Sequence, residues 1–82
     1  LIIADLSGAN LSGVNLAQTD LSSADLSEAD LSNADLSGAD LSWANLTDAY
    51  LEAVDLSATK LANTTMPDGR LNEEENMAMD DD

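Results

Sequence analysis

The sequence predicts an all-β solenoid in which short extended segments alternate with sharp corners. Leucine recurs every five residues along most of the 82-residue chain. A small residue usually stands two positions before each leucine, and Asp or Asn usually stands directly before it. Aromatic residues make up only 2% of the chain and cysteine is absent, which argues against a core of large rings and against a disulfide scaffold. The register comprises Leu1, Leu6, Leu11, Leu16, Leu21, Leu26, Leu31, Leu36, Leu41, Leu46, Leu51, Leu56 and Leu61, followed by Met66 and Leu71.

A period of five fits neither a regular helix nor a continuous strand. On an α-helix each leucine would be rotated by about 140° from the previous one, so the leucines would cover every face. On a strand, an odd step sends alternate leucines to opposite faces. An extended segment followed by a corner of about 90° keeps all the leucines inside, and such corners close a square coil of about 20 residues.

Each pentapeptide position then has an expected orientation. The small residue and the leucine point inward, the Asp or Asn between them points outward, and the Ser and the variable residue after the leucine form the corner. Residues 20 apart should stack at about 4.8 Å. The predicted ladders are Leu6, Leu26, Leu46 and Met66; Leu11, Leu31, Leu51 and Leu71; Leu16, Leu36 and Leu56; and Leu1, Leu21, Leu41 and Leu61.

The run Ala-Asp-Leu-Ser, which occupies 24–27 and again 34–37, resembles the pentapeptide repeat family. The resemblance covers residues 1 to about 71. It implies a right-handed quadrilateral β-helix with stacked leucines, here of about 3.5 coils of four pentapeptides. The pattern weakens toward the C-terminus, where Asp or Asn is replaced by Tyr50, Lys60, Thr65 and Arg70, and Gly69 takes the inward position.

The two ends of the chain differ. We divide the sequence into a repeat domain, 1–71, and an acidic C-terminal tail, 72–82. Pro67-Asp68-Gly69 predicts a turn. Asn72 followed by three glutamates resembles a helix N-cap, so we expect a short capping turn or helix that leads into disorder. Leu1 is already in register, so we expect a processed or truncated N-terminus.

The residue types argue against an enzyme. Histidine and cysteine are both absent, so the serines lack the usual activating base, and the Lys60 amine stands alone. A catalytic carboxylate pair would need a cleft, which a convex prism does not provide. Neither the EF-hand spacing nor the glycine-rich calcium repeat is present. We therefore expect no catalytic site, no cofactor and no specific metal site.

Negative charge is the strongest functional feature of the sequence. The chain has 17 acids and 2 bases, a net charge of −15. This charge argues against direct binding to nucleic acid or to anionic lipid. No apolar run is long enough for a membrane span or a secretory signal, so we expect a cytoplasmic protein. The expected partner is a basic protein surface, and the open edges of a solenoid allow either a monomer or an end-to-end dimer.

The interaction candidates are outward carboxylates and the two aromatic side chains. The predicted columns stack Asp20 on Asp40 and Asp35 on Asp55. Trp43 falls at a corner, where an exposed Trp is a frequent contact residue, although a ring packed on its own neighbours is the simpler alternative. The full set is Asp20, Asp25, Asp30, Asp35, Asp40, Asp55, Trp43 and Tyr50.

The sequence favours a non-catalytic structural or protein-interaction module that displays acidic faces on a rigid solenoid. The resemblance supplies an alternative, because the family includes DNA mimics that bind DNA gyrase. The repeat domain would carry one net negative charge per about 1.9 Å of its length, against about 1.7 Å in duplex DNA. The acids, however, surround the predicted prism without an obvious stripe. A third interpretation is one domain of a larger protein.

Overall fold

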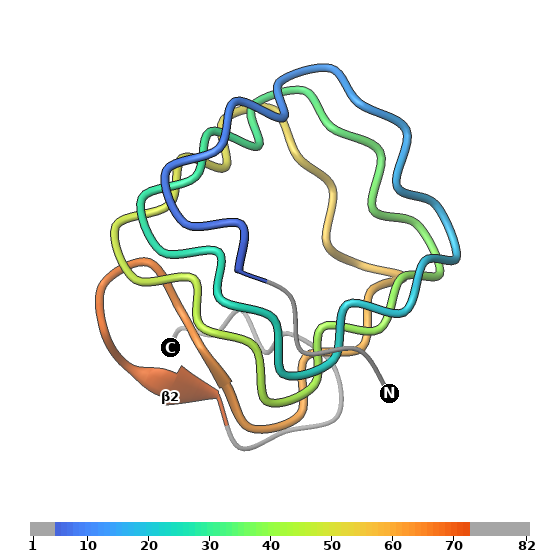
Figure 1. The fold of residues 1–82 in the computed structure, drawn as a ribbon. Helices are drawn as coiled ribbons and strands as arrows, with labels where there is room; N and C mark the ends of the chain where they lie inside the picture. The colour runs from blue at the N-terminus through green and yellow to red at the C-terminus, as the bar shows by residue number, and fades with distance from the viewer. Residues whose placement is uncertain (1–4, 73–82) are drawn as a thin grey trace.

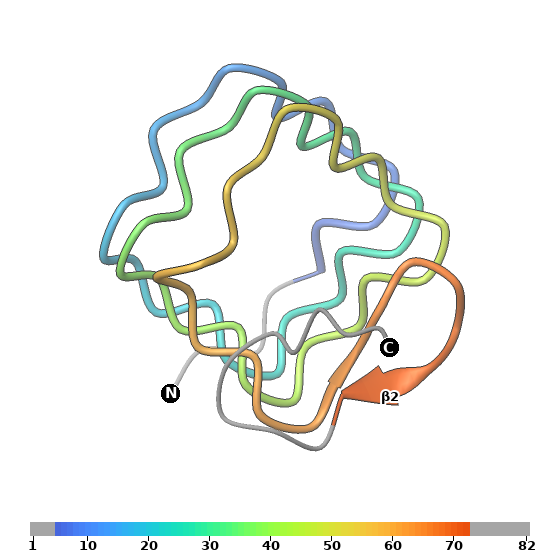
Figure 2. The same cartoon turned by 180° about the vertical axis from the view of Figure 1, so that it is seen from behind.

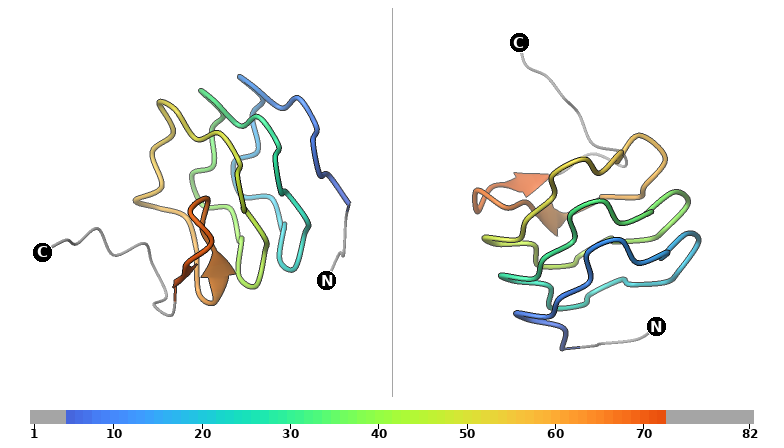
Figure 3. Two further views of the ribbon diagram at one scale, coloured as in Figure 1. Left: turned by 90° about the vertical axis from the view of Figure 1, so that its left-hand side faces the viewer. Right: turned by 90° about the horizontal axis from the view of Figure 1, so that it is seen from above.

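The chain winds around a central axis and returns above itself every 20 residues (Figure 1). The computed structural model describes residues 5–72. Figure 2 shows the same winding from behind, and Figure 3 shows successive turns of the chain lying side by side. We call residues 5–24, 25–44 and 45–64 the first, second and third layers. Within the described residues, isolated parallel bridges join Asp5 to Asp25, Asn10 to Asp30, Asn15 to Asp35, Asp20 to Asp40, Asp25 to Asn45, Asp30 to Tyr50, Asp40 to Lys60 and Asn45 to Thr65.

Backbone hydrogen bonds hold each layer against the next. The N–H of Leu26 donates to the carbonyl oxygen of Asn45 at 2.8 Å, and the same 19-residue step recurs along the chain. In the opposite direction, the N–H of Asp30 donates to the carbonyl oxygen of Ala9 at 2.9 Å. The second layer therefore pairs on both sides, which defines a β-helix-type fold, and this agrees with the sequence-based prediction. No described helix is long and apolar enough to cross a membrane.

The corners fall at the Ser and the variable residue, where the sequence places them. In a typical corner the N–H of Ala29 donates to the carbonyl oxygen of Leu26 at 3.0 Å, which closes a four-residue turn. The third residue of this turn, Glu28, has a φ of 63°. A positive φ at that position is characteristic of a type II turn. Gly8, Gly13 and Gly38 occupy it elsewhere, and glycine adopts this conformation at the lowest cost.

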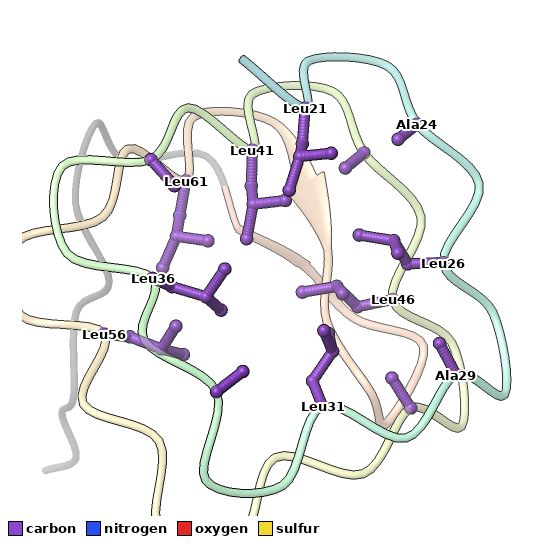
Figure 4. Packing of buried hydrophobic residues seen from close by; sticks show 14 residues of the cluster. Leu21, Ala24, Leu26, Ala29, Leu31, Leu36, Leu41, Leu46, Leu56 and Leu61 are labelled. Carbon is purple, nitrogen blue, oxygen red and sulfur yellow. The ribbon is translucent and has the colours of Figure 1, made fainter. Parts of the chain in front are cut away.

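The interior is lined by leucine and by the small residue of each repeat. Leu26 lies next to Leu46, and Leu21 next to Leu41, with their side chains directed inward (Figure 4). Leu26, Leu46 and Leu31 have no exposed surface. The core thus consists of predicted inward residues, since the two-residue step between small residue and leucine places both on one side. In the first layer the predicted inward residues are less covered, and Val14 is exposed. The buried set is Leu21, Ala24, Leu26, Ala29, Leu31, Ala34, Leu36, Ala39, Leu41, Ala44, Leu46, Ala49, Leu56 and Leu61.

Two threonines replace alanine among the inward residues of the third layer. Thr59 and Thr64 are fully buried, so their hydroxyl groups need partners. The Thr59 hydroxyl donates to the carbonyl oxygen of Leu36 at 2.9 Å, and the Thr64 hydroxyl donates to that of Leu41 at 2.6 Å. Each threonine therefore adds a bond between the third layer and the second.

A short hairpin ends the regular winding. Strand β1, Thr64–Thr65, pairs antiparallel with strand β2, Leu71–Asn72. The chain reverses through the predicted turn at 67–69, where the N–H of Gly69 donates to the carbonyl oxygen of Met66 at 2.8 Å. The Asn72 side-chain N–H donates to the carbonyl oxygen of Leu61 at 2.8 Å. The rest of the predicted acidic tail, with its expected helix, lies outside the described residues.

The hairpin corrects one predicted ladder. Leu71 keeps the five-residue register, but its side chain is 52% exposed. It does not continue below Leu51, because the chain has turned back before reaching it and β2 runs against β1. Leu1, the predicted start of another ladder, lies outside the described residues.

The predicted neighbours Asp35 and Asp55 lack the backbone bridge that joins the other columns. Asp35 forms its bridge with Asn15, and no bridge joins it to Asp55. On this side the N–H of Gly38 donates to the carbonyl oxygen of Ala58, at 2.9 Å, and the step is 20 residues instead of 19. The pairing is therefore shifted by one residue at this corner alone, since Asn33 and Leu41 on either side keep the 19-residue step.

Candidate functional site

The outward Asp and Asn side chains are fixed by a hydrogen bond to their own backbone. In each case Oδ1 accepts the N–H of the residue two positions later, at 2.9–3.2 Å within the described repeats. Where that residue is Ser or Thr, its hydroxyl often donates to the same oxygen, as Ser37 does to Asp35 at 2.7 Å. This arrangement stabilises the corner and aims the carboxylate outward in one orientation. It explains why Asp or Asn, then Leu, then Ser recurs.

These hydrogen bonds also influence ionisation. The Ser7 hydroxyl, followed by the Ser7 N–H, lowers the pKa of Asp5 below its ordinary value. The same two donors on the following serine lower the pKa of Asp20, Asp30 and Asp35. For Asp55 the backbone N–H of Ser57 is the larger cause of the lowered pKa. A carboxylate that accepts hydrogen bonds is stabilised in its charged form, so these groups keep their charge at neutral pH.

The structure places the predicted carboxylates in separate columns around the axis. Asp20 stacks on Asp40, with Lys60 next in the same column. Asp25 lies between Asp5 and Asn45, in a second column. Asp20 is exposed, whereas Asp25 and Asp40 are partly buried against their neighbours.

The remaining predicted carboxylates lie on the other two sides. Asp30 is partly buried between Asn10 and Tyr50 in a third column. Asp35 and Asp55 are exposed and border an open depression of about 270 Å³ where the pairing of the layers is interrupted. The structure therefore does not bring all the predicted site residues together on one face.

A second acidic feature was not singled out from the sequence. Glu28 and Asp48 stand 20 residues apart at the same corner, below Gly8, and the N–H of Asp48 donates to the carbonyl oxygen of Pro67 at 2.9 Å. Together with Tyr50 and Pro67 they line a shallow depression of about 640 Å³. Among the described corner columns, only this one has carboxylates at the variable position in successive layers. Comparing the variable residues of pentapeptides that are 20 residues apart in the sequence would have revealed this pair of carboxylates.

The two predicted aromatic candidates are both at the surface. The Trp43 side chain is 66% exposed and that of Tyr50 is 62% exposed. Trp43 lies at a different corner from Glu28, in register with Ser23 and Asn63, and its φ is 66°. The residues from 5 to 72 contain no group of three or more His, Cys, Asp or Glu side chains that could hold a metal ion.

The comparisons with known proteins agree with the repeat pattern. The family model for pentapeptide repeats matches residues 4–42 and 39–73, with eight copies. No curated protein matches the sequence.

Three solved structures are similar to the chain. A pentapeptide repeat protein from the thylakoid lumen of Arabidopsis thaliana is 31% identical, with 85% of this chain and 52% of that chain covered and a TM-score of 0.42. HetL, a pentapeptide repeat protein involved in heterocyst differentiation regulation from the cyanobacterium Nostoc, is 28% identical, with coverage of 83% and 47% and a TM-score of 0.38. A further Nostoc pentapeptide repeat protein is 35% identical, with coverage of 73% and 62% and a TM-score of 0.37. The chain spans about half to three fifths of the length of these proteins.

Proposed function

The chain belongs to the pentapeptide repeat family, and from this premise we propose that it is a non-catalytic interaction module that displays acidic faces to a basic protein partner. In this proposal the winding is a right-handed quadrilateral β-helix of about 3.5 coils, closed at its C-terminal end by the β1–β2 hairpin. The rod itself is the functional device, because it sets the spacing of the side chains that a partner contacts.

The hydrogen bond from each corner to the outward carboxylate is the observation that carries the proposal. The Oδ1 atom of Asp35 accepts both the N–H and the hydroxyl of Ser37, so the position of the carboxylate is set before any partner arrives. The same holds for Asp25 with Ser27. A preorganised acceptor loses less conformational entropy on binding than a free side chain does. The ordered carboxylates would also attract a positively charged partner and raise its association rate.

Asparagine substitutions test the charge without removing the fold. Asn10, Asn15 and Asn45 already form the same corner hydrogen bond with their side-chain oxygens. A variant with Asp25→Asn, Asp30→Asn, Asp35→Asn and Asp40→Asn should therefore keep its corners and lose four charges. The parent chain and this variant would be immobilised in parallel, and proteins captured from a cell extract would be identified at low salt and at about 1 M salt, where charge attraction is screened.

The expected result is that the parent captures proteins with basic surfaces, and that both the Asn variant and high salt abolish this capture. Circular dichroism would establish that the variant is folded. Capture of the same proteins by both chains, or retention of the partner above about 1 M salt, would overturn the electrostatic account.

A second candidate function is modulation of DNA gyrase by DNA mimicry. The corner that contains Glu28 and Asp48 favours this function, because it places one negative charge in the second layer and another at the same position in the third. A supercoiling assay titrated with the protein at two salt concentrations tests this function. Inhibition that fades as salt rises would support mimicry, whereas no effect at a many-fold molar excess would exclude it for this chain.

A further inference from the structure

Trp43 occupies a backbone position that glycine would fill at lower cost. It is the variable residue of its corner, with a φ of 66°, and Gly8, Gly13 and Gly38 take the equivalent place in other corners at a φ of 71–73°. An L-residue in this left-handed region is strained by its Cβ atom, and a bulky side chain is uncommon there. Other non-glycine residues of the described corners adopt the same conformation, so the fold tolerates this cost, and Trp43 has the largest side chain among them; the others are Gln18, Ser23, Glu28, Asn33, Asp48, Ala53 and Asn63.

Most of the Trp43 side chain faces solvent. It is 66% exposed, so about two thirds of its surface is open to a partner. Its indole N–H donates no hydrogen bond to any described residue, and its backbone N–H bonds to the carbonyl oxygen of Ala62, at 3.0 Å, as any residue there could. Large aromatic side chains that remain exposed in the free protein are typical of contact points at protein interfaces.

The surroundings of Trp43 indicate the charge of its partner. The corner lies between two columns, one containing Asp20 and Asp40 and the other containing Asp25. The column of Asp20 and Asp40 continues to Lys60 in the third layer. This positive charge would repel a basic partner, so it favours an approach of the partner from the side of the first two layers. A guanidinium group can stack on an indole ring and donate hydrogen bonds to carboxylates at the same time.

We propose that the Trp43 corner is a recognition site for an arginine side chain on a basic protein partner. The indole supplies the stacking surface, and the flanking carboxylates supply the charge. This inference rests on the proposed function, since it names the anchor of that same interaction. It differs from the simpler idea of charge attraction alone, which would direct a basic ligand equally to other acidic positions, such as the corner with Glu28 and Asp48.

Hexa-arginine is a suitable probe because Trp43 is the only tryptophan in the chain. The full chain would be titrated with the peptide by calorimetry and by NMR, where the single indole N–H gives one signal. We expect that signal to shift at lower peptide concentrations than the amides of Glu28 and Asp48. Trp43→Gly should weaken binding about two- to fivefold. Asn33→Gly is the matched control, because it removes an uncharged side chain from the same left-handed position in another column, and it should leave affinity unchanged.

The outcomes separate the anchor from the proposed function. If Trp43→Gly binds hexa-arginine as tightly as the parent, or if only Glu28 and Asp48 respond, the anchor is wrong and the acidic module stands. If neither the parent chain nor any variant binds the peptide, both the Trp43 anchor and the acidic interaction module are overturned. The melting temperature of Trp43→Gly should equal or exceed that of the parent, because glycine relieves the strain. A markedly lower value would assign the ring a structural role and overturn the inference.

Discussion

The N–H of Gly38 donates to the carbonyl oxygen of Ala58 at 2.9 Å, one residue later than the 19-residue step of the other corners would select. The displacement leaves neither the N–H of Leu36 nor that of Asp55 with a backbone bond to the facing layer. Leu36 is nevertheless buried, with only 1% of its surface exposed. The depression of about 270 Å³ beside it gives water a route to these backbone groups. Backbone pairing between the second and third layers is therefore interrupted at this segment, where the Thr59 hydroxyl still bonds to the carbonyl oxygen of Leu36.

Hydrogen exchange should detect this interruption. The amides of Leu26 and Leu31 each donate to the third layer at 2.8 Å, whereas that of Leu36 does not. Because an interlayer hydrogen bond must break before exchange, we expect the Leu36 amide to exchange about tenfold faster than the other two. Amide exchange measured by NMR would check it. Equal protection of the three leucine amides would contradict the interrupted pairing.

Two leucine truncations should distinguish the core from the end of the winding. Leu46 has no exposed surface, so Leu46→Ala should lower the free energy of unfolding by about 2–5 kcal/mol. Leu71 has the same place in the repeat but is 52% exposed, so Leu71→Ala should cost less than about 0.5 kcal/mol. Urea denaturation of both variants gives the two values. A large loss for Leu71→Ala would place its side chain inside, as the sequence register predicts.

The sequence predicted the parts of the fold that depend on local periodicity. The inward leucines, the outward Asp and Asn residues and the corners all follow from a five-residue unit whose geometry each repeat determines for itself. The Leu71 ladder failed because the spacing of residues does not record the direction of the chain. After the turn at 67–69 the register continues in the sequence, but the backbone runs the other way.

The candidate site could be predicted only in part. Two of its features, the corner with two carboxylates and the shifted pairing of one corner, depend on residues that are far apart in sequence. The corner with Glu28 and Asp48 forms only when residues 20 apart are brought together. The displacement between Gly38 and Ala58 arises in the backbone of the last layer and has no counterpart in the repeat consensus. The corner hydrogen bond was not predicted from the sequence, although Asp or Asn followed two residues later by Ser is a known turn pattern.

Gly38 and Gly13 should respond differently to alanine. Both have a positive φ, so either substitution introduces strain of about 1 kcal/mol or more. A Cβ atom on Gly13 meets nothing within 4 Å, whereas one on Gly38 would lie 2.9 Å from Cγ of Gln18 in the layer before it. Gly38→Ala should therefore lower the melting temperature more than Gly13→Ala does. In a Gln18→Ala background the two losses should become similar, and a difference that persists there would rule out this contact as its cause.

The corner carboxylates should make stability depend on acid. The serine donors lower the pKa of Asp30 and Asp35 in the folded chain, so the unfolded chain binds protons more readily than the folded one as the pH falls. Their stabilising contribution is complete well above the unfolded pKa of about 3.9 and is lost as the pH falls through the lower folded value. Asp30→Asn/Asp35→Asn should keep both corners and show a smaller fall in melting temperature between pH 6 and pH 2.5.

Ser37→Ala separates this effect from simple loss of charge. The substitution leaves every carboxylate in place and removes only the hydroxyl that donates to Asp35 at 2.7 Å. Because that donor is the largest cause of the lowered pKa of Asp35, the pKa should rise toward its ordinary value and the acid-induced loss should shrink. Melting curves across the same pH range would measure it. A profile that follows the parent at every pH would mean that the hydrogen bond from the Ser37 hydroxyl does not govern the response to acid.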